Sequence, residues 1–219
     1  MKRRVFLSGG VAALAVGGYL SADPSSGHLL VGAANAQETK EIDTSSIVEM
    51  VQGDPDAPVT IIEYASYTCP HCAAFQTGAY QDIKKNYIDT GKVRLIYREV
   101  YFDRYGLWAS MVARCGGPEK FFGISEMIYK GQNEWTRAGD ANAIVEELRK
   151  IGRLAGLDND TLDACFQDGD KAQALVAWFQ DNAEVDEVTA TPSFIVNGKK
   201  VANIPYEEFS ALIDAELGN

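Results

Sequence analysis

The stretch Val59–Cys72, VTIIEYASYTCPHC, decides the fold that this chain can adopt. Its first six residues are β-branched or aromatic except for Glu63, and this composition predicts a strand. Beyond Cys72, apolar residues recur at the spacing of one helix face: Ala73, Phe75, Ala79, Ile83 and Tyr87. A cysteine pair therefore lies where a strand gives way to the first turn of a helix.

This position suits a reactive thiol. The free backbone N–H groups and the positive dipole end of a helix stabilise a nearby anion, and a thiolate is an anion. We expect Cys69, near the helix N-cap, to be the exposed thiol that acts as nucleophile or leaving group. Cys72, one turn inside, is expected to be its shielded resolving partner. Pro70 fits the first helical turn because its missing N–H is not needed there, and His71 places an imidazole beside the sulfur.

These four residues predict a redox-active dithiol, with a structural disulfide or half of a metal site as alternatives. A disulfide across two residues closes a very small loop and constrains the unfolded chain little. A structural zinc site needs four ligands, commonly two such cysteine pairs. The other cysteines, Cys115 and Cys165, are single and distant from the motif. We therefore predict no metal at this site.

Glu63 lies six residues before Cys69, inside the apolar strand. A carboxylate there must either reach solvent at a strand end or lie partly buried, where burial raises its pKa. We favour the buried alternative, in which Glu63 could accept or return a proton near Cys72 during thiol exchange.

The order of elements along the rest of the chain predicts an α/β protein. Residues 92–101 alternate as a second strand, and the pattern from about 105 to 185 is helical throughout. A third strand at 191–196 ends at Asn197-Gly198, a strong signal for a tight hairpin, and a last helix opens at Pro205. Strand, helix, strand, helical block, hairpin and helix is the thioredoxin arrangement with a helical insertion.

Cys115 and Cys165 both fall on apolar helix stripes, so we expect both to point into the core of the helical block. Our hypothesis is a structural disulfide, which closes a loop of about fifty residues and stabilises the fold by roughly 4 kcal/mol on the chain-entropy model. Two buried free thiols and a second redox pair are the alternatives.

The N-terminus predicts export. A basic head, Met1–Arg4, precedes an apolar stretch, Val5–Leu20, and Ala34-Asn35-Ala36 is a small-x-small cleavage site. Residues 1–36 are thus a predicted signal peptide, with the twin-arginine route as an alternative to the general one and an uncleaved anchor as the alternative to cleavage.

Residues 1–36 carry three basic residues and one acidic residue, so cleavage takes the net charge from −11 to −13. Such an acidic chain repels phosphate backbones, and no nucleic-acid partner is expected. All four cysteines lie beyond residue 36, and an even count in an exported protein favours disulfide chemistry.

Together these residues resemble the DsbA-like thiol–disulfide oxidoreductases of the thioredoxin superfamily. The matching segments are Gly53–Tyr64 with Glu63 at the buried-acid position, Cys69-Pro70-His71-Cys72, Cys115 with Phe121-Phe122, Gly156-Leu157-Asp158 with Cys165-Phe166, and Thr191–Gly198. The resemblance covers about residues 50–217. It implies a thioredoxin fold with an inserted all-helical domain: 37–104 and 186–219 form the two parts of the thioredoxin-fold domain, and 105–185 is the insertion.

The resemblance also implies how the site works. It places a cis peptide bond at Thr191–Pro192, with the Thr191 backbone pairing with an extended substrate. It implies that the Cys69–Cys72 disulfide is donated to reduced, unfolded exported proteins in the periplasm, without a cofactor, and is restored by a DsbB-type quinone-linked membrane protein. Thr191 leaves the direction of electron flow open, because the best-known oxidases of the family have valine there and related isomerases have threonine. Two alternatives therefore remain: a disulfide isomerase or reductase, and a non-catalytic module that binds metal or unfolded chains.

Overall fold

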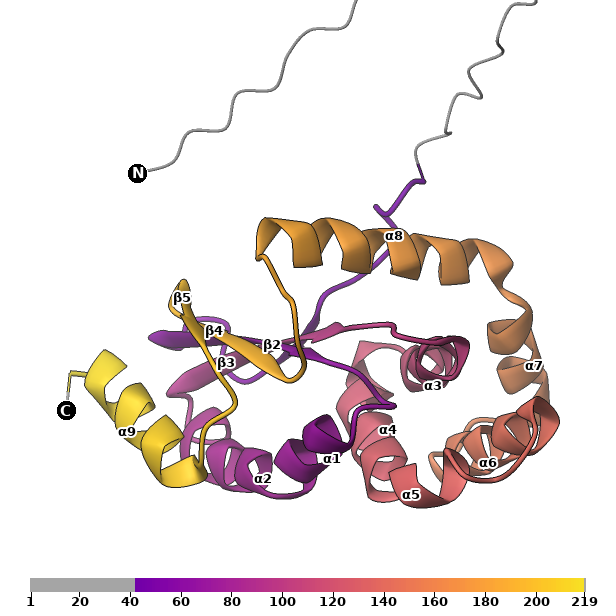
Figure 1. The fold of residues 1–219 in the computed structure, drawn as a ribbon, viewed down its shortest axis with the longest axis horizontal. Coiled ribbons are helices and arrows are strands. Elements are labelled where there is room, and N and C mark those ends of the chain that lie inside the picture. The colour runs from indigo at the N-terminus through magenta and orange to yellow at the C-terminus, as the bar shows by residue number, and fades with distance from the viewer. Residues whose placement is uncertain (1–41, 219) are drawn as a thin grey trace, which may run out of the picture. The chain divides into compact units, whose positions relative to one another are not determined.

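A five-stranded sheet forms the centre of the protein (Figure 1). The computed structural model describes residues 42–218, which belong to one compact unit. The strands are β1 (Met50–Gln52), β2 (Val59–Ala65), β3 (Val93–Glu99), β4 (Ser193–Val196) and β5 (Lys199–Val201), in the order β1-β3-β2-β4-β5. Strands β2 and β3 pair in parallel, and β4 and β5 form the predicted hairpin. The short edge strand β1, antiparallel to β3, was not predicted.

The predicted helix after the cysteine motif is confirmed at its start but is broken further along. It consists of α1 (Pro70–Thr77), α2 (Ala79–Ile83) and the π-helical turn η1 (Lys84–Ile88). The break falls at Gly78, where a Cβ would lie 2.9 Å from the Ala74 carbonyl oxygen. Only glycine permits the backbone to lie this close to the last turn of α1.

Six helices lie between β3 and β4: α3 (Arg104–Cys115), α4 (Pro118–Lys130), α5 (Gln132–Trp135), α6 (Ala141–Leu154), α7 (Asn159–Gln167) and α8 (Gly169–Val185). The carboxylates of Asp103, Asp140 and Asp158 accept hydrogen bonds from backbone N–H groups at the starts of α3, α6 and α7. Figure 1 shows α8 on one side of the sheet, with α1, α2 and the last helix, α9 (Tyr206–Glu216), on the other. No helix in the range 42–218 is both long and apolar enough to cross a bilayer.

Two apolar cores meet near the cysteine motif. One lies between the sheet and α1, α2 and α9, where the rings of Phe75 and Phe194 are 4.6 Å apart and those of Phe194 and Phe209 are 5.1 Å apart. The other fills the helical block and includes both Cys69 and Cys72. Because this second core reaches the motif, the helical block is part of the surroundings of the site.

The predicted Cys115–Cys165 disulfide is confirmed and joins α3 to α7. The alternative of two buried free thiols is therefore wrong. The predicted signal peptide, residues 1–36, lies outside the described residues.

Candidate active site

Cys69 and Cys72 occupy the predicted positions at the start of α1. Cys69 is the N-cap in extended conformation, its N–H donates to the Ser66 carbonyl, and its carbonyl accepts from the Ala73 N–H at 3.1 Å. Pro70 and His71 form the exposed first turn. Both cysteines are free thiols.

The prediction that Cys69 is an exposed thiol is wrong. Cys69 is 9% exposed, although this still exceeds the 0% of Cys72. The cover comes from a distant part of the chain, because the Sγ of Cys69 donates to the Thr191 carbonyl at 3.5 Å. The shielding predicted for Cys72 is confirmed.

The Thr191–Pro192 peptide bond is cis, as the family resemblance implied. Pro192 is buried and Thr191 is partly buried, directly before β4. Thr191 is 122 residues from Cys69 in the chain, and the antiparallel pairing of β2 with β4 brings the two together.

Burial raises the pKa of the Cys72 thiol well above its ordinary range, and hydrogen bonds from the Ser66 backbone and Thr191 oppose this only in part. Cys72 is therefore held as a neutral thiol at neutral pH. If Cys72 becomes a thiolate during exchange, it must take up a proton to be stable.

Glu63 is completely buried on β2, as predicted, and burial raises its pKa from the ordinary 4.5 to about 8. Its two carboxylate oxygens accept from the Nε2 of Gln76 at 2.9 and 2.8 Å, and these bonds lower the pKa in part. Gln76 lies four residues after Cys72, on the same face of α1. The sequence reasoning missed Gln76, although a glutamine four residues after Cys72, and so on the same helix face, was a usable signal.

A cluster of buried tyrosine hydroxyls lies in the core that contains the cysteines. The hydroxyls of Tyr97 and Tyr129 are 2.6 Å apart, and the Tyr67 hydroxyl lies 2.6 Å from the Ser125 Oγ. Burial raises the pKa of all three tyrosines. They are thus neutral hydrogen-bonding groups of the core.

A second buried glutamine contacts the motif. Gln132, from α5, donates to the backbone carbonyls of Tyr67 and Cys69. No sequence signal could have found this residue, because it lies 63 positions from Cys69 and its contact depends on the fold of the helical block.

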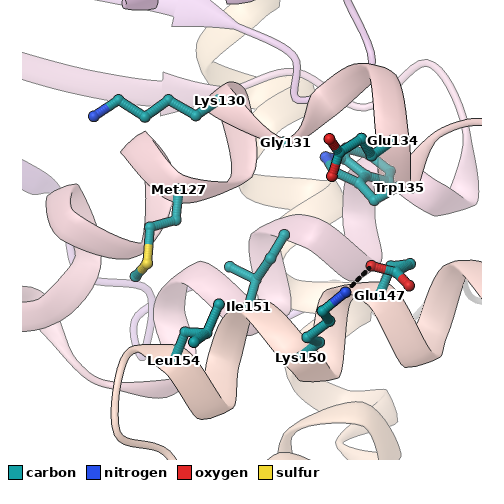
Figure 2. A pocket seen from close by; sticks show the side chains of 9 residues that line it. All are labelled: Met127, Lys130, Gly131, Glu134, Trp135, Glu147, Lys150, Ile151 and Leu154. Carbon is teal, nitrogen blue, oxygen red and sulfur yellow. Dashed lines mark hydrogen bonds and ion pairs between the residues drawn. The ribbon is translucent and has the colours of Figure 1, made fainter.

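A hollow of about 230 Å³ lies between α4, α5 and α6 (Figure 2). Its wall is apolar and its rim is charged; the lining residues are Met127, Lys130, Gly131, Glu134, Trp135, Glu147, Lys150, Ile151 and Leu154. None of the predicted site residues lines it. Among residues 42–218, no group of three or more His, Cys, Asp or Glu side chains is arranged to hold a metal ion.

A protein-family model described as Thioredoxin matches residues 45–215. Among curated proteins, a "Putative protein-disulfide oxidoreductase" of Rickettsia bellii is 34% identical over 170 residues, covering 77% of this chain and 64% of the relative. The "Disulfide bond formation protein D" of Bacillus subtilis is 28% identical over 180 residues, covering 76% of each. The chain spans between 60% and 64% of the length of the Rickettsia relatives that it matches.

Solved structures with similar folds include alpha-DsbA1 of Wolbachia pipientis, with a TM-score of 0.71 and 29% identity over 78% of this chain and 91% of that one. The oxidised form of BdbD from Bacillus subtilis has a TM-score of 0.69 at 24% identity, covering 78% of this chain and 94% of that one. The second likeness concerns the fold alone.

Proposed function

We propose, from the premise that this chain belongs to the DsbA-like members of the thioredoxin superfamily, that it is a thiol–disulfide oxidoreductase. It passes a Cys69–Cys72 disulfide to reduced polypeptides and so introduces disulfide bonds into them. The observation that carries this proposal is the asymmetry of the two thiols. Cys69 caps a helix N-terminus beside Thr191, whereas Cys72 is fully buried on the helix face that carries Gln76, the residue that donates to Glu63 of β2.

In the first step a substrate thiolate attacks the Sγ of Cys69. The Cys69–Cys72 bond breaks, a mixed disulfide forms between substrate and Cys69, and Cys72 leaves as a thiolate. Because burial disfavours that anion, Cys72 needs a proton. Glu63, with a pKa of about 8, is largely protonated at neutral pH and is the proposed proton source.

In the second step another substrate thiolate attacks the substrate sulfur of the mixed disulfide. A substrate disulfide forms, and Cys69 is released as a thiolate at the helix N-terminus, where the dipole stabilises the anion. The protein has then gained two electrons, and Glu63 takes a proton back from solvent. The backbone of Thr191, beside the Cys69 sulfur, is the proposed pairing edge for the extended substrate.

A redox titration against glutathione tests the direction of this reaction. We expect a potential clearly more oxidising than the roughly −270 mV of thioredoxin. A reducing, thioredoxin-like potential would instead favour the reductase alternative. Activity on scrambled rather than reduced substrate disulfides would favour an isomerase. Stoichiometric metal bound by both active-site thiols in freshly purified protein would favour the binding-module alternative.

The proton role of Glu63 is tested by Glu63→Gln. We expect the variant to oxidise a reduced dithiol peptide about a hundredfold more slowly near neutral pH, because general acid catalysis typically contributes at least that factor. The rate should also lose its pH dependence near pH 8. A wild-type rate and pH profile in this variant would show that Cys72 obtains its proton elsewhere.

We propose export to the periplasm, supported by the basic head and apolar stretch before Ala36 and by the family's disulfide chemistry. Sequencing the N-terminus of the mature protein tests cleavage after residue 36. The proposed reoxidation partner is a DsbB-type membrane protein, and the division into 37–104, 105–185 and 186–219 remains part of this proposal.

A further inference from the structure

We infer that Gln132 is a positioning residue that holds the turn carrying Cys69 in the geometry needed for the Cys69–Cys72 disulfide to close. This inference rests on the proposed function, since it concerns the same thiol pair. Through the Gln132 side chain, the helical insertion takes part in the reaction.

The carboxamide of Gln132 bridges two carbonyls of the turn that leads into α1. Its Nε2 donates to the Tyr67 carbonyl at 2.8 Å and to the Cys69 carbonyl at 2.9 Å. The Gln132 side chain is buried, so both bonds are shielded from water. An amide donor that uses both of its N–H groups on two carbonyls two residues apart fixes the path of the backbone between them.

Two further bonds attach the same turn to the helical insertion. The Tyr67 hydroxyl contacts the Ser125 hydroxyl of α4 at 2.6 Å, and the Thr68 Oγ1 donates to Asp103 at 2.8 Å. Asp103 is itself the N-cap of α3. The turn is thus attached to α3, α4 and α5, and Gln132 is the residue that bonds the backbone of Cys69 itself.

Helix α5 is also bonded to α4. The indole N–H of Trp135 donates to the Ile128 carbonyl of α4 at 2.9 Å. Figure 2 shows Glu134 and Trp135 at the hollow between α4 and α6. Because α5 is fixed by residues that do not belong to the site, Gln132 can act as a rigid support for the turn.

The consequence is a higher effective concentration of Cys69 at Cys72. When glutathione disulfide oxidises the dithiol, one Cys69–Cys72 bond forms, two glutathione thiols are released and the two protein thiols give up their protons. A disulfide demands specific distances between the two residues, and a turn held in one conformation loses less freedom when the ring closes. Without Gln132 the turn gains freedom, and the closed disulfide loses stability relative to the dithiol.

The test is the equilibrium constant for oxidation by glutathione in Gln132→Met, a variant that keeps length but cannot donate. We expect this constant to fall about fivefold, the effect of one to two hydrogen bonds. Thr136→Val is the matched control, since it removes the bond from the Thr136 hydroxyl to the Gln132 carbonyl within α5 but leaves the Gln132 carboxamide and its two bonds to the turn in place; its constant should stay within about twofold of wild type. Should Gln132→Met fail to fold, Gln132→Leu serves, because it is uncharged, smaller and has no N–H.

A Gln132 variant that unfolds more readily, like Thr136→Val, but keeps the wild-type equilibrium constant would overturn the inference and leave Gln132 with a structural role. A wild-type protein whose Cys69 and Cys72 do not exchange with glutathione at all would instead overturn the proposed function. The two failures are therefore distinguishable in one experiment.

Discussion

The protein buries two glutamates on the same face of its sheet and treats them in opposite ways. Glu63 lies on β2. Glu99 lies on β3 and pairs with Ala65, which follows Glu63 by two residues on β2. Both are essentially unexposed, at 0% and 1%. Glu63 is bonded by the neutral amide of Gln76, whereas Glu99 is bonded by the guanidinium of Arg114 at 2.5 and 2.7 Å and by the Ser110 hydroxyl at 2.8 Å.

The difference shows that the hydrogen-bonding partner of a buried carboxylate determines its role. Glu99 and Arg114 form a buried bidentate ion pair that ties β3 to α3, and Arg114 also donates to the Val48 carbonyl. A neutral amide supports either state of the carboxylate, and burial then raises the pKa of Glu63 into the range where it exchanges protons. We infer a structural task for Glu99 and a proton-carrying task for Glu63.

The largest expected effect is the pH dependence of stability that Glu63 creates. Its pKa is about 8 when folded and 4.5 in ordinary surroundings, so between these values the folded protein binds more protons than the unfolded chain. The Glu63 contribution is therefore fully present below pH 4.5 and is lost as pH rises through 8. The loss amounts to about 5 kcal/mol as an upper value.

Glu63→Gln removes this dependence, because glutamine keeps the shape and does not titrate. Urea unfolding across pH, in a Cys69→Ala/Cys72→Ala background that excludes thiol titration, measures the difference between the two chains. The exposed Glu119→Gln is the control, for which no such difference is expected. Parallel stability profiles with and without the Glu63→Gln change would show that Glu63 is charged when buried and that the comparison with Glu99 fails.

Arg114→Met should cost about 4 kcal/mol in the free energy of unfolding, because it leaves Glu99 buried without its cation. Changing Glu99→Leu in the same chain should restore most of the loss, since an apolar pair of similar volume has no buried charge to compensate. The destabilisation caused by Arg114→Met alone should grow as pH rises, in the same direction as the loss of stability that buried Glu63 causes. A cost below about 1 kcal/mol would mean that Glu99 does not depend on Arg114.

The local sequence pattern made buried Glu63 predictable, but it did not reveal the bonding partners of Glu63 or of Glu99. Glu63 was identified because one acidic residue interrupts an apolar strand beside a cysteine motif. The strand, the start of the helix and the Asn197-Gly198 hairpin were also predicted from short stretches of sequence. The bonding partners Gln76 and Arg114 were not identified. Their identity depends on how α1 and α3 pack on the sheet, 13 and 15 residues from their glutamates.

The features that were missed or wrong share a physical cause. The contacts at Cys69 reach across 122 residues to Thr191 and 63 to Gln132, and residue spacing does not encode such distances. Edge strand β1 has three residues and takes its stability from β3. The cis bond at Thr191–Pro192 was expected from the family resemblance, since an X–Pro bond taken alone is usually trans.

The smallest expected effect concerns the amide that distinguishes Glu63 from Glu99. Gln76 donates to both oxygens of Glu63 and thereby opposes the rise in its pKa. Gln76→Leu removes these bonds, so the pKa should move further up, by about one unit, which corresponds to about 1.4 kcal/mol. The fall in stability should then end at a correspondingly higher pH in the urea assay, and a protonated-carboxyl infrared band that disappears in Glu63→Gln should persist to higher pH.

Gln81→Leu is the matched control for this change, because the Gln81 side chain donates to the backbone carbonyl of Gln76 without contacting Glu63. It should lower stability equally at all pH values and leave the infrared band unchanged. If Gln76→Leu does the same, the amide only packs, and desolvation alone sets the protonation of Glu63. If only Gln76→Leu shifts the band, a single neutral donor tunes the pKa of Glu63, whereas Glu99 has a guanidinium as its ion-pair partner.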